Sequence, residues 1–396
     1  CATEEERTMK LPFEGITVIS IEQAIAAPLA TRHLADWGAR VIKIERTGDG
    51  DFARKYDTAM HGLSSQFVWA NRSKESMELD IKSEFGQDVL EALLERADVF
   101  IQNLAPGAAE KLGLDAASLV KRHPRLVACD ISGYGSTGPY SKKKAYDLLV
   151  QCETGFLSIN GTPGEMAKCG LSLVDIATGM YALNGILTGL YRRERTGEGT
   201  AFEVSLFDAM AEWMSYPAYF KRDSGKDLVR AGTRHASIAP YGPFRAGDGK
   251  TVFFGIQNER EWKSFCENVL EDPLLFRDPR FCSNVERVSH RDGLEALITE
   301  RFAAWTSDQV LERLERAAIA NARLNSIEEF LEHPQLRERG RVREVDSEVG
   351  PLEMFLPPAI FQGMEPVMNP VPALGQHTES ILEELGFHQA PRAAAG

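Results

Sequence analysis

Short apolar runs alternate with amphipathic stretches in the first half of the chain. Residues 16–21 (ITVISI) and 41–45 (VIKIE) are apolar enough for buried strands, and residues 27–37 between them have a helical period that ends at Gly38. A strand, a helix and a second strand at this spacing form a βαβ unit, in which the strands are parallel and the crossover is right-handed. The start of the chain therefore predicts a parallel sheet.

The same alternation continues to about residue 206. An amphipathic helix is predicted over residues 83–96, and a long apolar helix over residues 176–193, which ends in a basic stretch followed by glycines. Further strands are predicted at residues 99–102, 126–131 and 202–206. We predict an α/β fold, with a Rossmann-like, doubly wound sheet in the large domain.

The pattern changes after residue 221, where short strands and helices no longer alternate regularly. Residues 241–257 predict a β-hairpin that turns at residues 247–249 (GDG). Helices are predicted at residues 261–270, 292–305, 307–317 and, at the end of the chain, 378–385. The middle of the chain therefore predicts a smaller α+β domain over residues 228–328.

Composition excludes more functions than it indicates. The 396 residues carry a net charge of −13, whereas a nucleic-acid-binding chain usually has a basic excess. The six cysteines include no CxxC pair, so we expect no metal site and a reducing, cytoplasmic setting, with Cys129 as a core residue. No apolar run has the roughly 18–20 residues of a membrane span. Residues 1–9 lack the apolar core of a secretory signal. We expect neither nucleic acid nor membrane as a partner.

Gly133, Gly135 and Gly138 match the GxGxxG pattern of dinucleotide-binding folds. That pattern belongs in the first βα turn and should open a helix. Here it follows a later strand and continues into Pro139, whereas the first βα turn (residues 22–28) has no glycine triplet. We interpret these glycines as a turn and expect no bound NAD or FAD.

Asp175 is the main candidate for chemistry. An aspartate directly before a predicted helix is typical of an N-cap. It can instead be a nucleophile, because an unperturbed aspartate, with a pKa of about 3.9, is ionised at neutral pH without help from a base. The second interpretation predicts acyl transfer through an aspartyl intermediate, with backbone N–H groups near Ile176 as donors to the oxyanion.

Polar residues that follow predicted strands are candidates for ligand binding, because ligands of an open parallel sheet lie beyond the carboxyl ends of its strands. Arg46 and Asn103 each directly follow such a strand. Of the three lysines at residues 142–144, the first two are typical of a solvated loop. Lys144, nearest in sequence to Tyr146-Asp147, is the better ligand candidate.

Ordered segments along nearly the whole chain resemble the class III CoA-transferases, the family of formyl-CoA transferase and carnitine CoA-transferase. The longer segments are GITVISIEQAIAAPLATRHLADWGARVIKIERTGDGD (15–51), NRSKESMELDIKSEFGQDVLEALLERADVFIQNLAPG (71–107), DISGYGSTGPY (130–140), AYDLLVQCETG (145–155) and VDIATGMY (174–181). The shorter ones are LGL (112–114), TGEG (196–199) and GQHT (375–378).

The resemblance implies a large Rossmann-like domain built from both ends of the chain, a small middle domain and an interlocked homodimer. The expected boundaries are residues 11–205 for the N-terminal part of the large domain, 206–227 for a linker, 228–328 for the small domain, and 329–396 for a linker and the C-terminal part that returns to the large domain. The implied partners are an acyl-CoA, a small carboxylic acid and a second copy of the chain. Coenzyme A is then a substrate, and no cofactor is permanently bound.

The resemblance also assigns site residues by position. Asp175 takes the place of the family nucleophile. The positions that contact CoA in the family are Arg46, Leu79, Lys82, Asn103, Leu104, Lys111 and Lys144. The positions around the acyl pocket are Ile25, Ala26, Tyr146, Asp147, Arg234 and His235.

Two departures from the family pattern bear on the substrate. Ile25 stands where formyl-CoA transferase has a glutamine, and residues 232–238 (GTRHASI) replace its glycine-rich lid, which argues against oxalate as the acceptor. Arg234 and His235 resemble residues of dicarboxylate-type members. We expect them to bind the distal carboxylate of an acid such as itaconate, mesaconate or malate, with succinyl-CoA as donor. The alternative for this pair is an exposed polar loop.

The α-methylacyl-CoA racemases share the expected fold and are the main alternative activity. They carry a histidine in a Gly-His-Asp motif, where this chain has Ala145-Tyr146-Asp147. Racemisation needs a base and an acid on opposite faces of the acidic carbon, and a tyrosine with a solution pKa near 10 is a poor base. The sequence therefore favours CoA transfer, and a non-catalytic acyl-CoA-binding protein is a third interpretation.

Overall fold

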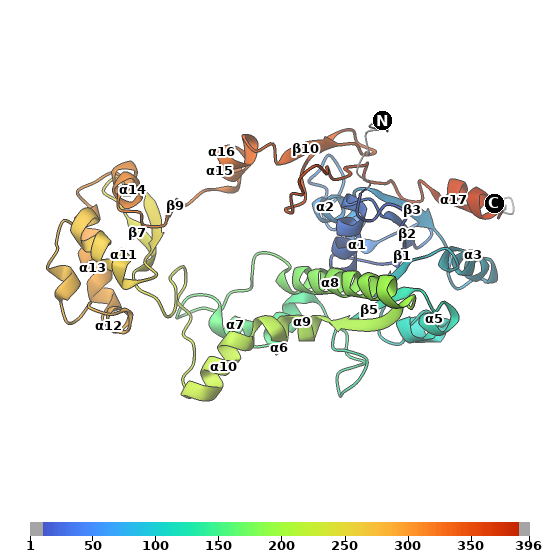
Figure 1. Ribbon diagram of the computed structural model, residues 1–396, viewed down its shortest axis with the longest axis horizontal. Helices are drawn as coiled ribbons and strands as arrows, with labels where there is room; N and C mark the ends of the chain where they lie inside the picture. The colour runs from blue at the N-terminus through green and yellow to red at the C-terminus, as the bar shows by residue number, and fades with distance from the viewer. Residues whose placement is uncertain (1–10, 388–396) are drawn as a thin grey trace, which may run out of the picture. The chain divides into compact units, whose positions relative to one another are not determined.

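The computed structural model describes residues 11–387, which form two compact units. Within this range, unit 1 comprises residues 11–154, 169–215 and 336–387, and unit 2 comprises residues 155–168 and 216–335. Each unit has its own sheet and its own hydrophobic core (Figure 1). Most of the predicted site residues lie in unit 1.

A six-stranded parallel sheet forms the centre of unit 1. Its strands are β1 (Thr17–Ile21), β2 (Arg40–Glu45), β3 (Lys74–Glu78), β4 (Val99–Gln102), β5 (Val127–Ser132) and β6 (Thr200–Ser205). Their order is β3-β2-β1-β4-β5-β6, and every neighbouring pair is parallel. The predicted doubly wound sheet is thereby confirmed. The direction of winding reverses between β1 and β4, which is where such folds bind ligands.

The polar strand β3 is absent from the sequence prediction. Its sequence KESME has no apolar run, yet Lys74, Ser76 and Met77 are buried. The Lys74 ammonium pairs with Glu22 at 2.7 Å, and the Ser76 hydroxyl donates to Glu45 at 2.7 Å. A buried strand is normally recognised by its apolar side chains. A strand whose inward side chains are paired with carboxylates lacks that signal.

Helices connect and cover the strands of unit 1. They are α1 (Ala26–Asp36), α2 (Ser65–Asn71), α3 (Glu84–Leu94), α4 (Ala108–Leu112), α5 (Ala116–Arg122), α6 (Asp147–Glu153), α8 (Leu173–Thr196), α9 (Leu206–Trp213) and the short 3₁₀ helix η1 (Phe52–Lys55). Glycines allow α8 to lie very close to its neighbours. A Cβ at Gly179 would lie 2.6 Å from the carbonyl oxygen of Ala26 in α1, and one at Gly189 would lie 2.6 Å from Val127 in β5.

The C-terminal part of unit 1 covers the free edge of β3. After the antiparallel pair β10 (Val342–Val345) and β11 (Leu352–Phe355), α17 (Thr378–Leu385) packs against α3 and β3. The His377 N–H donates to the Ser76 carbonyl at 2.9 Å, and the Ser76 N–H donates to His377 Nδ1 at 3.1 Å. This contact, between residues 301 positions apart, satisfies backbone groups that an edge strand would otherwise leave open.

Unit 2 is built on a three-stranded antiparallel sheet of β7 (Tyr241–Arg245), β8 (Thr251–Gly255) and β9 (Asn321–Arg323). The predicted hairpin is confirmed by the pairing of β7 with β8. The helical elements are α7 (Phe156–Ile159), α11 (Glu259–Ser264), η2 (Phe265–Val269), η3 (Leu275–Arg277), α12 (Asn284–Ser289), α13 (Arg291–Phe302), α14 (Ser307–Arg316) and α15 (Ile327–Leu331). Two further helices, α10 (Ser215–Ser224) and α16 (Pro334–Arg337), each contain one of the four points at which the chain crosses between the units.

Candidate active site

Asp175 lies inside the first turn of α8, because that helix begins at Leu173. The prediction that the helix starts after Asp175 is therefore wrong by three residues. The cause is a cap that comes from outside the helix. Asp147 Oδ1, at the start of α6, accepts the N–H groups of Val174 at 2.7 Å and of Asp175 at 3.3 Å. A carboxylate placed here satisfies orphan donors and complements the positive end of the helix.

Because Asp147 caps α8, the side chain of Asp175 is not needed to cap that helix. The N-cap position itself is Ser172, whose side chain makes no capping bond. Asp147 is held in turn by Gln151, whose Nε2 donates to the other carboxylate oxygen at 2.6 Å. In the part of the chain that the structure describes, no hydrogen bond engages the Asp175 carboxylate. The N-cap interpretation of Asp175 is thus wrong for this side chain.

The pKa of Asp175 is raised to about 7. Partial burial, which disfavours the charged form, is the main cause, and the negative charge of Asp147 adds to it. The expectation that this carboxylate is fully ionised at neutral pH is therefore wrong for the protein without substrate. A strongly shifted carboxyl beside a second carboxylate is typical of functional sites.

The turn between β1 and α1 lies beside Asp175. Asp175 precedes Gly179 by about one turn of α8, and Gly179 is the residue that packs against Ala26. Ile25 and Ala26, both predicted for the acyl pocket, are buried in this contact region. Helix α1 begins there without a side-chain cap. The first N–H groups of a helix have no partner within it, so the start of α1 offers donors beside the carboxylate.

Ile176, the predicted source of oxyanion donors, is already engaged. Its N–H donates to the Ser172 carbonyl at 3.0 Å, while the preceding N–H groups bond to Asp147. The first N–H groups of α8 are therefore all occupied by bonds that cap the helix. The start of α1, by contrast, has no side-chain cap.

Two predicted CoA-binding residues meet at the turn between β1 and α1. Asn103, after β4, accepts the Gln23 N–H at 2.8 Å and donates to the Gln23 carbonyl at 2.8 Å. Arg46, after β2, donates to the Gln23 side chain at 3.3 Å. Strands β1 and β4 flank the point where the winding reverses. The sequence argument that placed Arg46 and Asn103 at one edge of the sheet is confirmed for this pair.

The other predicted CoA-binding residues differ in exposure. Leu79 is buried in a core of unit 1 and Leu104 packs against the same core, and the N–H groups of both are already bonded, to the Glu45 carbonyl and to the Gln102 side chain. Lys82, Lys111 and Lys144 are exposed. Exposed ammonium groups near the carboxyl edge suit the phosphates of CoA. Lys143, by contrast, is paired with Glu153.

The glycine turn after β5 is tied to the protein by its own amides. The Gly135 N–H donates to Ser132 Oγ at 2.9 Å, and the Ser136 N–H donates to Glu203 at 2.9 Å. Gly133 is required because a Cβ there would lie 2.5 Å from the Ala145 Cβ. These amides face side chains rather than a phosphate, which agrees with the interpretation of this motif as a turn.

Tyr56 belongs to the surroundings of Asp175 and was missed by the sequence analysis. Its pKa is raised to about 12, mainly by burial, with contributions from the charges of Asp51, Asp175 and Tyr146. Tyr146 is largely exposed, whereas Tyr56 is about half-buried. Tyr56 follows η1, far from Asp175 in sequence, and no local pattern marks it. Only the fold brings the two together.

Arg234 and His235 lie in unit 2, in a loop that the structure holds firmly. Arg234 pairs with Glu295 at 2.8 Å, and the His235 ring stacks on Tyr241 with centroids 5.3 Å apart. Arg291 donates to the His235 carbonyl at 2.8 Å. The Arg234 side chain is 44% exposed, so part of its guanidinium is open to a ligand.

Clusters of metal-ligating side chains and long apolar helices bear on cofactors and membranes. Within residues 11–387 no group of three or more His, Cys, Asp or Glu side chains is arranged to hold a metal ion. Helix α8 is long and apolar enough to cross a membrane, with a mean hydropathy of 1.3, a possibility that the sequence analysis overlooked. Its packing against α1, β5 and β6 is that of a core helix.

The strand order defines a doubly wound α/β protein, a class of fold in which ligands bind at the switch point of the sheet. More narrowly, the chain belongs to CoA-transferase family III, which it matches over residues 13–378. It is therefore an enzyme, a CoA-transferase, and the resemblance seen in the sequence is confirmed.

The relatives of this chain are CoA-transferases for small acids. It is 31% identical to the human succinyl-CoA:glutarate CoA-transferase, over 94% of this chain and 86% of the relative. It is 32% identical to the succinate–glutarate CoA-transferase of Agrobacterium fabrum, over 95% and 96%. An acetyl-CoA:oxalate CoA-transferase of Acetobacter aceti is 34% identical, over 83% and 85%.

Solved structures agree with the fold. A CaiB/BaiF family protein from Brucella suis matches with a TM-score of 0.81 and 31% identity, covering 95% of this chain and 100% of that one. A Mycobacterium tuberculosis protein matches with a TM-score of 0.83 and 26% identity, covering 94% and 99%. The predicted fold class is confirmed.

Proposed function

We propose that this CoA-transferase moves CoA from succinyl-CoA to a small dicarboxylic acid through an aspartyl-CoA thioester on Asp175. The carrying observation is that Asp147 caps α8 and leaves the Asp175 carboxylate unbonded at the ligand-binding edge of the sheet. Asp175 is then free for covalent catalysis.

The first half-reaction loads CoA onto the enzyme. The Asp175 carboxylate attacks the thioester carbonyl, the C–S bond breaks, and CoA leaves as the thiolate, which gives a mixed anhydride. The thiolate then attacks the aspartyl carbonyl carbon of that anhydride. The donor acid leaves as a carboxylate, and Asp175 carries CoA as a thioester. One thioester is exchanged for another, so no ATP is consumed.

The second half-reaction repeats these steps in reverse with the acceptor acid. Its carboxylate attacks the aspartyl thioester and releases CoA thiolate, which then attacks the acceptor's carbonyl and restores Asp175. Each attack places negative charge on an oxygen beside Asp175. The N–H groups at the uncapped start of α1 are proposed as its donors, because fixed amides there need no reorganisation.

The acceptor is proposed to be a dicarboxylic acid held at its distal end by Arg234 and His235. The part-open guanidinium of Arg234 supports this role, since arginine binds carboxylates with two parallel hydrogen bonds. Relatives named for glutarate, mesaconate and malate also support it. Itaconate is a further candidate of the same chemistry.

A mass-spectrometric acid screen tests the reaction. Purified enzyme is incubated with succinyl-CoA and, separately, glutarate, mesaconate, malate, itaconate, oxalate and a monocarboxylic acid of similar size. We expect new acyl-CoA masses with dicarboxylic acids. If succinyl-CoA is returned unchanged with every acid while CoA binds tightly, the chain is a binding protein and the proposal is wrong.

A trapping experiment tests the intermediate. Hydroxylamine added after incubation with succinyl-CoA should convert an aspartyl thioester to a hydroxamate on the peptide that contains Asp175. Enzyme incubated with free CoA is the matched control and should give none. A hydroxamate on another residue would reassign the nucleophile.

Self-association and the cellular compartment are two further parts of the proposal. An exposed apolar face on α8, formed by Met180, Leu187 and Tyr191, supports self-association, which light scattering at several concentrations can test. Cys129, Cys152, Cys266 and Cys282 form no disulfide, which supports a reducing compartment such as the cytoplasm.

A further inference from the structure

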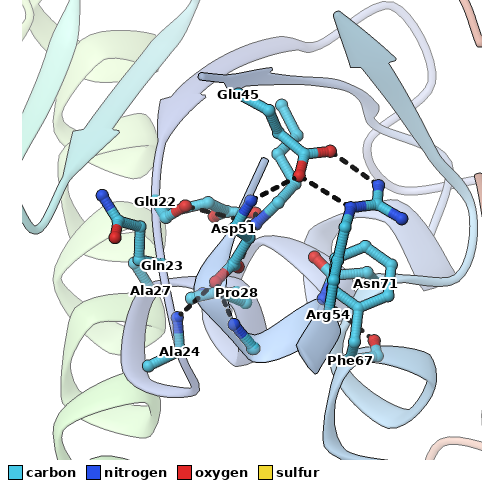
Figure 2. A network of polar contacts seen from close by, with 12 residues as sticks. Glu22, Gln23, Ala24, Ala27, Pro28, Glu45, Asp51, Arg54, Phe67 and Asn71 are labelled. Atoms are coloured by element: carbon cyan, nitrogen blue, oxygen red, sulfur yellow. Dashed lines mark hydrogen bonds and ion pairs between the residues drawn. The ribbon is translucent and has the colours of Figure 1, made fainter. Parts of the chain in front are cut away.

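Asp51 is a buried carboxylate that holds backbone from two segments at the carboxyl edge of the sheet. Its Oδ1 accepts the Ala24 N–H at 3.1 Å and the Ala53 N–H at 2.9 Å, and its Oδ2 accepts the Lys43 ammonium at 2.8 Å. Figure 2 shows Asp51 between the turn at Ala24 and the residues around Arg54. Its side chain is 1% exposed, so it cannot itself touch a substrate.

Ala24, the first residue held by Asp51, has an unfavourable backbone conformation. Its φ is +61°, in the left-handed region that costs a non-glycine residue about 1 kcal/mol or more. The conformation persists because bonds on both sides impose it. Asn103 fixes Gln23 through its N–H and its carbonyl, and Asp51 fixes the next N–H. The residues that follow, Ile25 and Ala26, open α1 beside Asp175.

Ala53, the second residue held by Asp51, belongs to η1. Asp51 is the N-cap of this short helix, and Tyr56 is the residue that ends it. Tyr56 is close enough to Asp175 and Tyr146 for their charges to raise its pKa. A single oxygen, Asp51 Oδ1, therefore ties together two segments that border Asp175.

Asp51 is held in place by a buried network of ion pairs and hydrogen bonds. Lys43 also contacts Glu22 at 3.5 Å, and Glu22 pairs with Lys74 at 2.7 Å, with all four side chains fully buried or nearly so. Glu45, which accepts the Asp51 N–H at 2.9 Å, fixes the backbone of the same residue. A network of this kind restricts the carboxylate to one position.

We propose that Asp51 is a positioning residue for acyl transfer, which sets the start of α1 and the Tyr56 segment against Asp175. The inference rests on the proposed function, because it concerns the rate of the aspartyl chemistry. It predicts that Asp51 affects the chemical steps rather than the binding of CoA, since its contacts are with the turn and with η1.

Steady-state kinetics of Asp51→Asn and Asp51→Ala test the proposal. We expect kcat to fall about 10-fold in Asp51→Asn and about 100-fold in Asp51→Ala, since displacement by about 1 Å can cost 100-fold. The KM for succinyl-CoA should change less than about 3-fold. The matched control is Asp49→Asn, because Asp49 is exposed and pairs with Lys55 only at the surface. Its kcat should stay within about 2-fold.

Hydrogen exchange gives a second measurement that does not depend on turnover. Amides of residues 23–27 should exchange faster in Asp51→Ala than in wild type, while amides of β5 should not change. Folded Asp51→Ala with wild-type kcat, or with unchanged exchange at residues 23–27, would overturn the inference. If instead wild type transfers no CoA, the proposed function fails, and exchange still decides whether Asp51 sets the turn.

A paired variant covers the case in which the single substitutions do not fold. Asp51→Asn leaves the buried Lys43 ammonium without its main partner, which is strongly destabilising. Combining Asp51→Ala with Lys43→Met instead removes both buried charges together with the oxygen that accepts the Ala24 N–H. This folded variant should show the reduced kcat and near-normal KM, and full activity would contradict the proposal.

Discussion

Unit 1 contains two regions with buried or partly buried carboxylates, and their surroundings shift the carboxyl pKa values in opposite directions. Burial alone would raise the pKa of Glu22, but the charges of Lys74 and Lys43 outweigh it and hold that pKa below its ordinary value. At Asp175, burial is reinforced by the second carboxylate of Asp147, and the pKa rises to about 7. Glu22, paired with lysines, stabilises the fold. Asp175 has no such partner, and a carboxyl with a raised pKa of this kind is typical of a functional site.

The clearest test of this difference is removal of the unpaired carboxylate. Asp175→Asn and Asp175→Ala should lose at least about 1000-fold in CoA transfer, because the nucleophile of both half-reactions is gone. CoA affinity, measured by calorimetry, should stay within about 3-fold. Purified Asp175→Ala that retains more than a few per cent of the transfer rate would place the chemistry elsewhere.

Removing the Lys43 charge from the paired region should lower the stability of the fold. Lys43→Met leaves Asp51 and Glu22 with less compensating charge and should lower the free energy of unfolding by about 3–5 kcal/mol. Urea unfolding of Lys55→Met, which removes an exposed ion pair with Asp49, provides the control and should cost about 1 kcal/mol or less. Equal losses in the two variants would contradict the contrast.

The pH dependence of kcat/KM sharpens the contrast, because this ratio reports groups of the free enzyme. Only ionised Asp175 attacks, so kcat/KM should rise tenfold per pH unit below about 7 and level off above it. Asp147→Asn keeps an oxygen for the α8 cap but removes the like charge. Asp147→Asn should therefore shift the rise of kcat/KM to lower pH by about 0.5–1 unit. A rise that does not shift would show that Asp147 acts only as a cap.

The smallest expected effect is on stability. The folded-state pKa of Asp175 is raised above its unfolded value, so wild type loses stability as pH rises from about 4 to about 7. Asp175→Asn has no such loss. It should be more stable than wild type at pH 8 by on the order of 1–3 kcal/mol, and nearly equal at pH 4. Chemical unfolding at the two pH values measures this, and a variant less stable at pH 8 would contradict it.

The sequence predicts those helices and strands whose buried side chains are apolar. The runs at residues 16–21 and 99–102 become β1 and β4, because apolar side chains in short runs have few alternatives to a buried strand. Strand β3 is not predictable in this way, since its inward lysine and serine are matched by carboxylates from β1, β2 and their connections. Such pairing is visible only after folding.

The residues of the candidate site likewise fall into two groups, those predictable from the sequence and those that depend on the fold. Arg46 and Asn103 are predictable because the end of a parallel strand is a position in the sequence as well as in space. Asp147 as the cap of α8, and Tyr56 as a neighbour of Asp175, depend on contacts between distant segments. The raised pKa of Asp175 likewise follows from its surroundings and from no feature of its residue type.

The contact between His377 and Ser76 also has a consequence for biosynthesis. The ribosome must synthesise the chain as far as residue 377 before the edge of β3 receives these backbone partners. Residues 216–335, which form most of unit 2, emerge earlier and have a core of their own. Unit 2 can therefore be complete while β3 still presents an open edge. A nascent chain stalled before residue 377 would expose that edge to association with other chains.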